Sequence, residues 1–265
     1  MLARALLLLG LLTPRASALA PPFSHADWTA VLQRFVDESG SVDYAGLARD
    51  RALLDRYLAS LERASPDSDP ARFPTRDEQL AYWLDAYNAM VFRGVLARGP
   101  ETESVWGDGL FGLGFFTARN VVLGGRRMSL KSLEDEIVRR RFRDPRVHAA
   151  LNCASRGCPR LPRQAFEGPT LNAELDAAMR EFVGEERNVR VDVAARSVWL
   201  AKIFAWFEGD FLAFEKRQGT PTPTLLDYVN RYRAAGARLP SGLAIHFLDY
   251  DQRLNAQARP SASAP

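Results

Sequence analysis

Apolar residues recur every three or four positions along most of the chain, which is the spacing of one face of an α-helix. The strongest case begins at Thr75, where Glu78 three residues later completes a capping box and the apolar pattern continues to Val95. We therefore predict a central core helix over this segment. The same spacing predicts further helices over residues 27–40, 47–63, 132–142, 171–182 and 224–232.

Two pairs of short extended runs lie between the predicted helices, residues 121–123 with 127–130 and residues 189–193 with 196–200. Gly124-Gly125 and Ala194-Ala195 separate the members of each pair, as in a β-hairpin. A last strand is predicted over residues 243–248, and the aromatic cluster from Ile203 to Phe214 is predicted to be core. Because the strands are joined as hairpins rather than by helical crossovers, this pattern predicts an α+β fold, a helix-rich single domain in which antiparallel hairpins form a small sheet.

The first 18 residues have the layout of a signal peptide. A basic residue precedes the apolar run 5–12, and small residues offer a cleavage site after Ala18. The apolar run is shorter than the roughly 20 residues that span a bilayer. We therefore expect residues 1–18 to be removed and the mature protein to be periplasmic or secreted, without a transmembrane segment. Residues 19–256 are predicted to form the single globular domain, and residues 257–265 a disordered tail.

Composition adds bounds on size and partners. The 265 residues are 47% hydrophobic, which is enough to bury one substantial core. The formal charge is +3, and removing residues 1–18 takes away Arg4 and Arg15 and leaves +1. A nearly neutral mature chain gives no electrostatic reason to expect nucleic acid as a partner. The expected partner is an unidentified small molecule or another protein.

Any thiol, disulfide or metal chemistry must involve residues 144–159, which hold both cysteines and His148. The spacing of His148, Cys153 and Cys158 is not that of a zinc site, and no metal or other cofactor is expected. Two interpretations stay open: a Cys153–Cys158 disulfide, or one cysteine as a nucleophile with His148 as its base. A separation of five residues between His148 and Cys153 points the two side chains apart in a regular helix or strand.

A bend in the chain would remove this difficulty. Pro145 ends the preceding predicted helix, residues 147–151 are predicted to form a short strand, and Gly157 provides backbone freedom for a sharp turn. We therefore expect His148 and the two cysteines to form one cluster, whatever its purpose.

Three further polar residues, Asn88, Glu134 and Asn255, lie within apolar segments and are predicted to form a polar network. A buried amide must find hydrogen-bond partners, so Asn88 is expected to bond to the backbone of a neighbouring loop; the alternative is an amide that faces a substrate. The Gly-rich segment that contains Trp106 and Phe116 lacks the spacing of a phosphate-binding loop. It is predicted to be an ordered aromatic loop or, alternatively, a lid.

Several short motifs occur in the order in which one protein family carries them. They are Val42-Asp43-Tyr44, residues 81–89, Leu133-Glu134 with Ile137 and Arg139, residues 144–148 through Cys158-Pro159, residues 200–204 with Trp206, Asp210-Phe211, and Tyr250-Asp251 with Leu254-Asn255. Over roughly residues 27–256 the chain thus resembles the domain of unknown function 547 family, and the signal-peptide layout indicates an exported bacterial member. It departs from the family pattern at Asp85, Ala201 and Gln252, where the family usually has asparagine, serine and tryptophan. The family has no established biochemical activity, so the resemblance implies the extent of the domain and not a reaction.

The residues leave two main functions open. One is a thiol-dependent hydrolase or acyltransferase with Cys153 or Cys158 as nucleophile and His148 as base, in which the three polar residues named above orient groups or stabilise an oxyanion. The alternative is a non-catalytic binding or interaction module with a structural Cys153–Cys158 disulfide, which presents the aromatic loop to a ligand. A thiol-disulfide oxidoreductase is a third hypothesis, although the cysteine spacing departs from Cys-x-x-Cys. A free thiol in an open cleft near His148 favours the enzyme, and bonded sulfur atoms favour the module.

Overall fold

The computed structural model describes residues 21–109, 112–118 and 120–258. The predicted signal peptide, Phe111 of the aromatic loop and most of the predicted tail lie outside these residues. Gln257, the first residue of that predicted tail, donates its backbone N–H to the carbonyl of Val42.

The α-helices are α1 (Ala26–Phe35), α2 (Tyr44–Arg49), α3 (Ala52–Arg63), α4 (Arg76–Arg98), α5 (Gly114–Thr117), α6 (Leu130–Ser132), α7 (Leu171–Gly184), α8 (Lys202–Trp206), α9 (Glu208–Arg217) and α10 (Leu225–Tyr232). The other elements are the 3-10 helices η1 (Pro70–Arg72), η4 (Pro145–Ala149) and η5 (Ala235–Ala237), the π-helix η3 (Leu133–Phe142), and the strands β1 (Val121–Leu123), β2 (Arg126–Met128), β3 (Val189–Asp192), β4 (Ser197–Leu200) and β5 (Ala244–Phe247).

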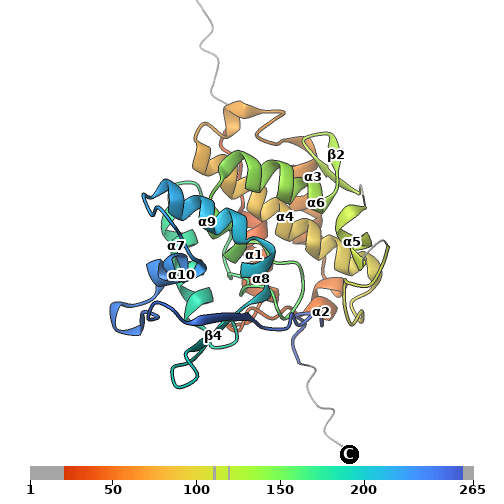
Figure 1. The fold of residues 1–265 in the computed structure, drawn as a ribbon. Coiled ribbons are helices and arrows are strands. Elements are labelled where there is room, and N and C mark those ends of the chain that lie inside the picture. Colours follow the sequence, from red (N-terminus) through yellow and green to blue (C-terminus); the bar gives the residue numbers. More distant parts are fainter. Residues whose placement is uncertain (1–20, 110–111, 119, 259–265) are drawn as a thin grey trace, which may run out of the picture.

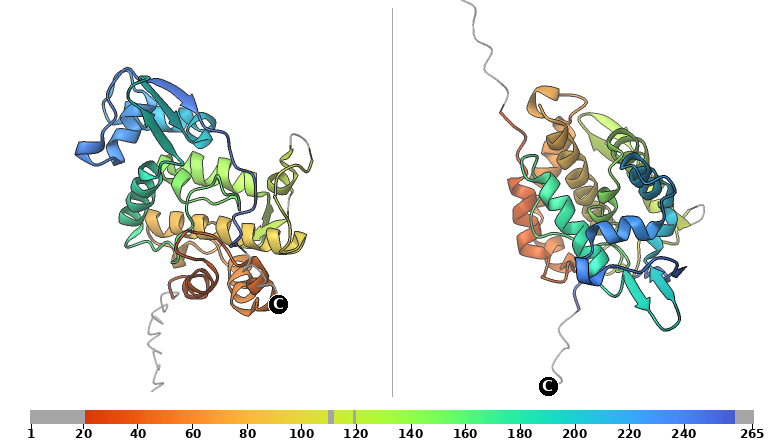
Figure 2. Two further views of the ribbon diagram at one scale, coloured as in Figure 1. Left: turned by 90° about the horizontal axis from the view of Figure 1, so that it is seen from below. Right: turned by 60° about the vertical axis from the view of Figure 1, so that its left-hand side comes forward.

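Helix α4 is the central element of the fold (Figure 1). Its predicted capping box is confirmed: the backbone N–H of Glu78 donates to Thr75 Oγ1, and the backbone N–H of Thr75 donates to the Glu78 carboxylate. The N-terminal helices lie on one side of α4, and η3 and the C-terminal elements lie on the other (Figure 2, left). Because neighbours cover α4 on both sides, its side chains are buried almost without interruption from Leu80 to Leu96.

The predicted helices are confirmed in position, with differences at their ends. The first ends at Phe35, because the backbone becomes extended at Val36. The second divides into α2 and α3 around Asp50, which leaves the helical conformation. The predicted helix that follows Ser132 is the π-helix η3, and it ends where Arg143 adopts a left-handed φ of 52°. Apolar periodicity locates helices well because it reports burial, but a single backbone rotation sets where each one stops.

The strands confirm the α+β class and form two separate sheets. Strands β1 and β2 pair as the predicted antiparallel hairpin, and β3 and β4 pair as the second. Strand β5 joins β4 in a parallel orientation, with Val198 opposite Ile245. The parallel pairing follows from the connection, since α8, α9 and α10 carry the chain back before β5 begins.

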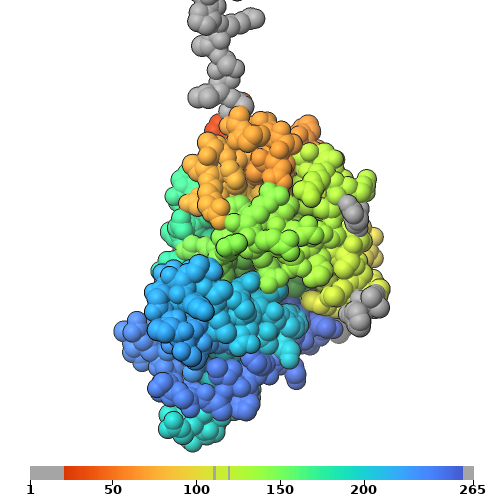
Figure 3. Space-filling model, turned by 45° about the horizontal axis from the view of Figure 1, so that its top comes forward, coloured from red at the N-terminus to blue at the C-terminus, as the bar shows by residue number. Residues whose placement is uncertain are grey.

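The buried apolar side chains form two cores that meet across the middle of the molecule. The first core surrounds α4 and extends from Phe23 to the start of α7. The second core joins the end of α7 to β3, β4 and helices α8 to α10. Figure 3 shows the surface along which the later segments, in cyan and blue, lie against the earlier segments in green. Within the ranges that the structure describes, none of the helices combines the length and the apolar character needed to cross a membrane.

The segment before the cysteines is a 3-10 helix rather than the predicted strand. Asp144 caps this helix, η4, by accepting a hydrogen bond from the backbone N–H of Arg146. Val147, Ala149 and Leu151 are buried, but His148 and Ala150 between them are buried as well, so the segment lacks the alternating burial of a half-exposed strand. In so short a segment the Asp-Pro start favours a turn of helix, because proline supplies the φ angle of a first helical position.

Candidate functional site

Cys153 and Cys158 form a disulfide at the junction of the two cores. Their Cα atoms are 6.3 Å apart, within the usual range for a disulfide, and no cysteine in the described chain is free. The connecting loop closes through a turn in which the Cys158 N–H donates to the carbonyl of Ser155. Ala154, which directly precedes this turn, takes the left-handed conformation, with φ of 61°.

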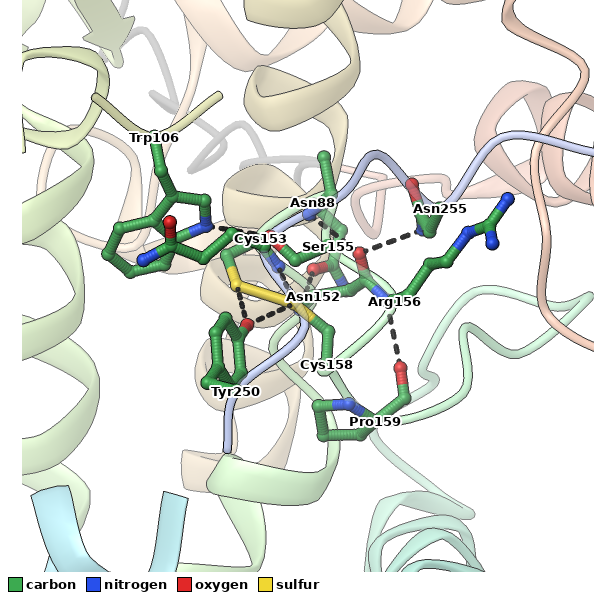
Figure 4. The surroundings of a disulfide bond; sticks show 12 residues. Asn88, Trp106, Asn152, Cys153, Ser155, Arg156, Cys158, Pro159, Tyr250 and Asn255 are labelled. Atoms are coloured by element: carbon green, nitrogen blue, oxygen red, sulfur yellow. Dashed lines mark hydrogen bonds between the residues drawn. A yellow bond between two sulfur atoms is a disulfide. The ribbon is translucent and has the colours of Figure 1, made fainter. Parts of the chain in front are cut away.

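Gly157 lies within this turn, as predicted, but the turn does not require a left-handed glycine. The φ of Gly157 is not positive, and a side chain at this position would lie 2.7 Å from the ring of Tyr250. The glycine therefore permits close approach of Tyr250 to the loop, and the left-handed residue of the loop is Ala154. The Tyr250 hydroxyl donates towards both sulfur atoms, at 2.9 Å from Cys153 Sγ and 3.1 Å from Cys158 Sγ (Figure 4).

Three asparagines surround the other side of the cysteine loop. Asn88 is buried, donates to the carbonyl of Ala150 at 3.0 Å and accepts from the backbone N–H of Asn152 at 2.9 Å. The expectation that Asn88 bonds to loop backbone is therefore confirmed. Asn152 Oδ1 accepts from the Ala154 N–H and from Asn255 Nδ2, so Asn88 and Asn255 belong to one network through Asn152 (Figure 4).

Asn152, the residue that connects this network, was not among the polar residues predicted from the sequence. Its Nδ2 also donates to the carbonyl of Pro159 at 2.8 Å, which ties the two ends of the cysteine loop together. A polar residue directly after the apolar run 149–151 was the available signal. Glu134, predicted to belong to the same network, lies apart from it and contacts Tyr87 instead.

His148 is buried between the two cores, and its bonded partner is a carboxylate rather than a sulfur atom. Its Nε2 lies 2.8 Å from Asp210 Oδ2, and its ring stacks on Phe207 with centroids 4.0 Å apart. Arg139 Nε donates to the same Asp210 oxygen at 2.7 Å. Burial lowers the pKa of His148, although the bond to Asp210 acts in the opposite direction. Burial opposes ionisation of Asp210, but the hydrogen bonds from His148 and Arg139 outweigh it and lower the pKa to about 2.

A cavity of about 470 Å³ lies between the cores and brings His148, both cysteines and Glu134 to one space. The expected cluster of His148 with the cysteines is therefore present as shared walls of this cavity. Aromatic rings supply much of the remaining wall: Tyr87, Trp106, Phe116, Trp206, Phe207 and Tyr250.

Trp206 corrects the prediction that the aromatic cluster is entirely core, whereas Phe207 packs against the second core and also lines the cavity. Phe204 and Phe211 are fully buried, but Trp206 is 45% exposed. The helical spacing of aromatic residues did not distinguish the two sets, because both faces of the short helix α8 carry aromatic side chains. Trp106 of the aromatic loop is fixed by a hydrogen bond from its Nε1 to Ser155 Oγ at 2.7 Å.

Glu134 is the one cavity-lining carboxylate without an ion pair among the described residues. Its hydrogen-bond partner is the Tyr87 hydroxyl, which donates to Oε2 over 3.4 Å. Burial, reinforced by the negative charge of Asp135, raises the pKa of Glu134 to about 7. Lys131 and Arg139 do not neutralise Glu134, because both bind the carboxylate of Asp135. A carboxyl group with a raised pKa inside a cavity is a candidate functional group.

The three departures from the family pattern do not touch the cavity. Asp85 is buried on the far side of α4, where its carboxylate accepts from Trp28 Nε1 and lies 3.0 Å from His25 Nδ1. Burial raises its pKa to about 6. Gln252 is exposed, and Ala201 is buried at the start of α8.

In the described residues, no group of three or more histidine, cysteine, aspartate or glutamate side chains is placed to hold a metal ion.

Comparison with known proteins finds a family model that matches part of the chain and no characterised relative. No curated protein matches the chain, and no solved structure matches it. Residues 71–183, which include α4, η3, η4 and the cysteine loop, match the model of the family described as "Protein of unknown function, DUF547", and this match supports the resemblance seen in the motifs.

Proposed function

We propose that this protein is a non-catalytic binding module in which the Cys153–Cys158 disulfide is structural and the cavity beside it holds a small organic ligand. The observation that carries the proposal is the state of the sulfur atoms: both lie in one disulfide, and the cavity contains no thiol. A thiol-dependent hydrolase or acyltransferase needs a thiolate nucleophile. Neither sulfur atom can attack a substrate while the disulfide is intact.

The contacts of His148 also favour the binding module over the thiol enzyme. A base for a cysteine nucleophile must lie within hydrogen-bond reach of the sulfur atom. The Nε2 atom of His148 is held by Asp210 instead, and the ring is held by Phe207. The hydroxyl next to both sulfur atoms belongs to Tyr250, whose pKa is raised by burial, so this group stays neutral and donates.

The cavity has the properties of a ligand site. Its volume of about 470 Å³ lies in the range of small-molecule sites, which are mostly apolar with a few polar groups that orient the ligand. Trp206 is an exposed aromatic residue at its edge, and Glu134 is a polar group inside it. The disulfide, Tyr250 and Trp106 hold one wall in place through the contacts described above.

Alkylation of the native protein tests the proposal. The disulfide predicts that an alkylating reagent labels neither cysteine until the protein is reduced and unfolded, as read by intact mass. A second arm measures binding of small aromatic molecules through the fluorescence of Trp106 and Trp206. A cysteine that reacts near neutral pH in native protein, with loss of that reactivity in His148→Ala, would instead support the thiol enzyme.

We further propose that the protein is an exported bacterial protein, periplasmic or secreted. The signal-peptide layout of residues 1–18 supports this, and so does the disulfide, since disulfides persist mainly in oxidising compartments. Intact-mass measurement of exported material should find a chain that begins near Leu19. Retention of Met1 or Leu2 on that material would contradict the proposal.

A further inference from the structure

We propose that the cavity selects an organic cation with an aromatic or apolar body, such as an arylalkyl amine, and that Glu134 is the counter-ion of its ammonium group. This inference rests on the proposed binding function and adds the chemical class of the ligand. The pairing of charges around the cavity and the aromatic rings that line it support this ligand class.

One carboxylate that lines the cavity, that of Glu134, has no cationic partner among the described residues. Lys131 Nζ lies 2.6 Å from Asp135 Oδ2, and Arg139 Nη1 lies 2.5 Å from Asp135 Oδ1. Arg139 also binds Asp210, which His148 contacts as well. Two cations are thus already matched by two aspartates, and His148 is neutral because its pKa is lowered. Asp210 lies outside the cavity lining, and of the two carboxyl groups in the lining, Asp135 pairs with both cations while Glu134 has no cationic partner.

The remaining contacts of Glu134 leave room for a donor. Its Tyr87 partner is 3.4 Å away, which is long for a hydrogen bond to a carboxylate. The side chain is half-buried rather than sealed, so its oxygen atoms can be reached from the cavity. An ammonium group supplies several N–H donors and the opposite charge, and both would favour the ionised form of Glu134.

Three aromatic rings form a continuous wall near this carboxylate. The centroids of Trp206 and Tyr250 are 4.7 Å apart, those of Trp106 and Tyr250 are 5.7 Å apart, and those of Trp106 and Trp206 are 6.1 Å apart. Aromatic faces attract cations and also pack against apolar groups. The same cavity already contains one such contact, since the Arg139 guanidinium carbon lies 4.6 Å from the centroid of Phe207.

Other ligand classes fit the cavity less well. An anion would have to take Lys131 or Arg139 from Asp135 and would leave that aspartate without its partner. A neutral apolar ligand would cover Glu134 without supplying a donor, and the carboxyl group would have to stay protonated. A cation requires neither change.

Titration of the oxidised, mature protein with three matched probes tests the inference. The probes are benzylamine, benzyl alcohol and benzoate, which share a ring and differ in charge. Tryptophan fluorescence or calorimetry should show that benzylamine binds at least about tenfold more tightly than the other two at pH 8, a difference of about 1.4 kcal/mol.

Variants assign the preference to Glu134. Glu134→Gln keeps the size of the side chain and removes its charge, so the preference for benzylamine should fall to within about twofold, while benzyl alcohol should bind as before. Glu136→Gln removes a charge from an exposed position on the same helix and should leave all three affinities unchanged.

The pH profile gives an independent readout. Between pH 6.5 and 8.5, Glu134 ionises while the amine keeps its proton, so the affinity for benzylamine should rise about threefold in wild-type protein and stay flat in Glu134→Gln. Lys131, bound to Asp135, is the neighbouring cation on the same helical segment. The pKa values of the other groups near Glu134 are shifted away from this range, downwards for Asp135, His148 on η4 and Asp210 on α9, and upwards for Arg139, Tyr87 on α4 and Tyr250.

The outcomes separate the two proposals. If none of the probes binds, the binding function and this inference are both overturned. If benzyl alcohol or benzoate binds as tightly as benzylamine, or if Glu134→Gln keeps the preference, the cavity is a ligand site but the inference about cations is wrong.

Discussion

The polar side chains on the two sides of the disulfide differ in how completely the protein satisfies their hydrogen bonds. On one side, the amides of Asn88, Asn152 and Asn255 all find partners within the protein, over distances of 2.8 to 3.2 Å. On the other side, Glu134 has one partner at 3.4 Å and borders a cavity. Polar groups that are satisfied by the chain stabilise the fold, and a polar group left unsatisfied inside it is available to a ligand. We refer to these as the asparagine side and the cavity side.

Two carboxylates near the cavity show the same contrast in their pKa values. Burial opposes ionisation of both, but His148 and Arg139 bind Asp210 and bring its pKa to about 2. No cation binds Glu134, so its pKa rises to about 7. The difference comes from the partners and not from the type of residue.

The largest expected effect is on the asparagine side, at Asn152. Asn152→Leu leaves the Pro159 carbonyl, the Ala154 N–H and the Asn255 amide without their partner. We expect a loss of about 4 kcal/mol in the free energy of unfolding, measured by urea denaturation, since each unsatisfied buried group costs about 1–3 kcal/mol. The matched amide replacement Gln252→Leu, at an exposed position, should change stability by less than about 0.5 kcal/mol. Equal losses in the two variants would remove the basis for the comparison.

A smaller loss is expected at Asn88. Asn88→Leu leaves the Ala150 carbonyl and the Asn152 N–H unpaired, and the free energy of unfolding should fall by about 1–3 kcal/mol. Denaturation curves of wild type and variant under the same conditions provide the measurement. An unchanged midpoint would show that these hydrogen bonds do not stabilise the asparagine side.

The disulfide lies between the two sides, so its removal should affect both. Replacing Cys153 and Cys158 by alanine opens a short loop, for which chain entropy predicts a loss of about 2 kcal/mol. Tyr250 also loses both of its sulfur partners, so ligand binding in the cavity should weaken. Thermal unfolding and probe titration of the double variant test the two effects. Full stability together with full binding in this variant would contradict a structural role for the disulfide.

On the cavity side, Glu134 should reduce stability when it ionises. Its pKa in the folded protein, about 7, is above the ordinary value of 4.5, so the folded state holds the proton more tightly than the unfolded state. The stabilisation is complete below pH 4.5 and is lost as pH rises towards 7 and above. Because the side chain is partly open to the cavity, we expect a loss of only about 1 kcal/mol relative to Glu134→Gln.

Unfolding measurements at pH 4.5 and pH 8 compare the two proteins. The difference in stability between wild type and Glu134→Gln should favour the variant at the higher pH. Asp85 contributes a pH dependence of the same sign, and it cancels in this difference because both proteins retain it. A difference that does not change with pH would mean that Glu134 has no raised pKa.

The amino-acid sequence by itself determined the local structure and much of the asparagine side. The capping box at Thr75, the helical periodicity and the Gly124-Gly125 turn are satisfied by residues within a few positions of each other, so each could be read from a short segment. Burial of Asn88 followed from its place on an apolar helix, and the short spacing of the cysteines made a disulfide one of the two interpretations.

Only the tertiary structure decided which polar groups are paired and where the cavity lies. Asn255 reaches Asn152 across 103 positions, and Asp210 reaches His148 across 62. The cavity exists because α8 and the segment around Tyr250 border the same space as α4 and η3, and no local pattern distinguishes exposed Trp206 from buried Phe204. Periodicity reports that a side chain faces an apolar surface, but it does not report whether the opposing surface fills the space. That depends on how two separately formed cores meet, which is a property of long-range packing.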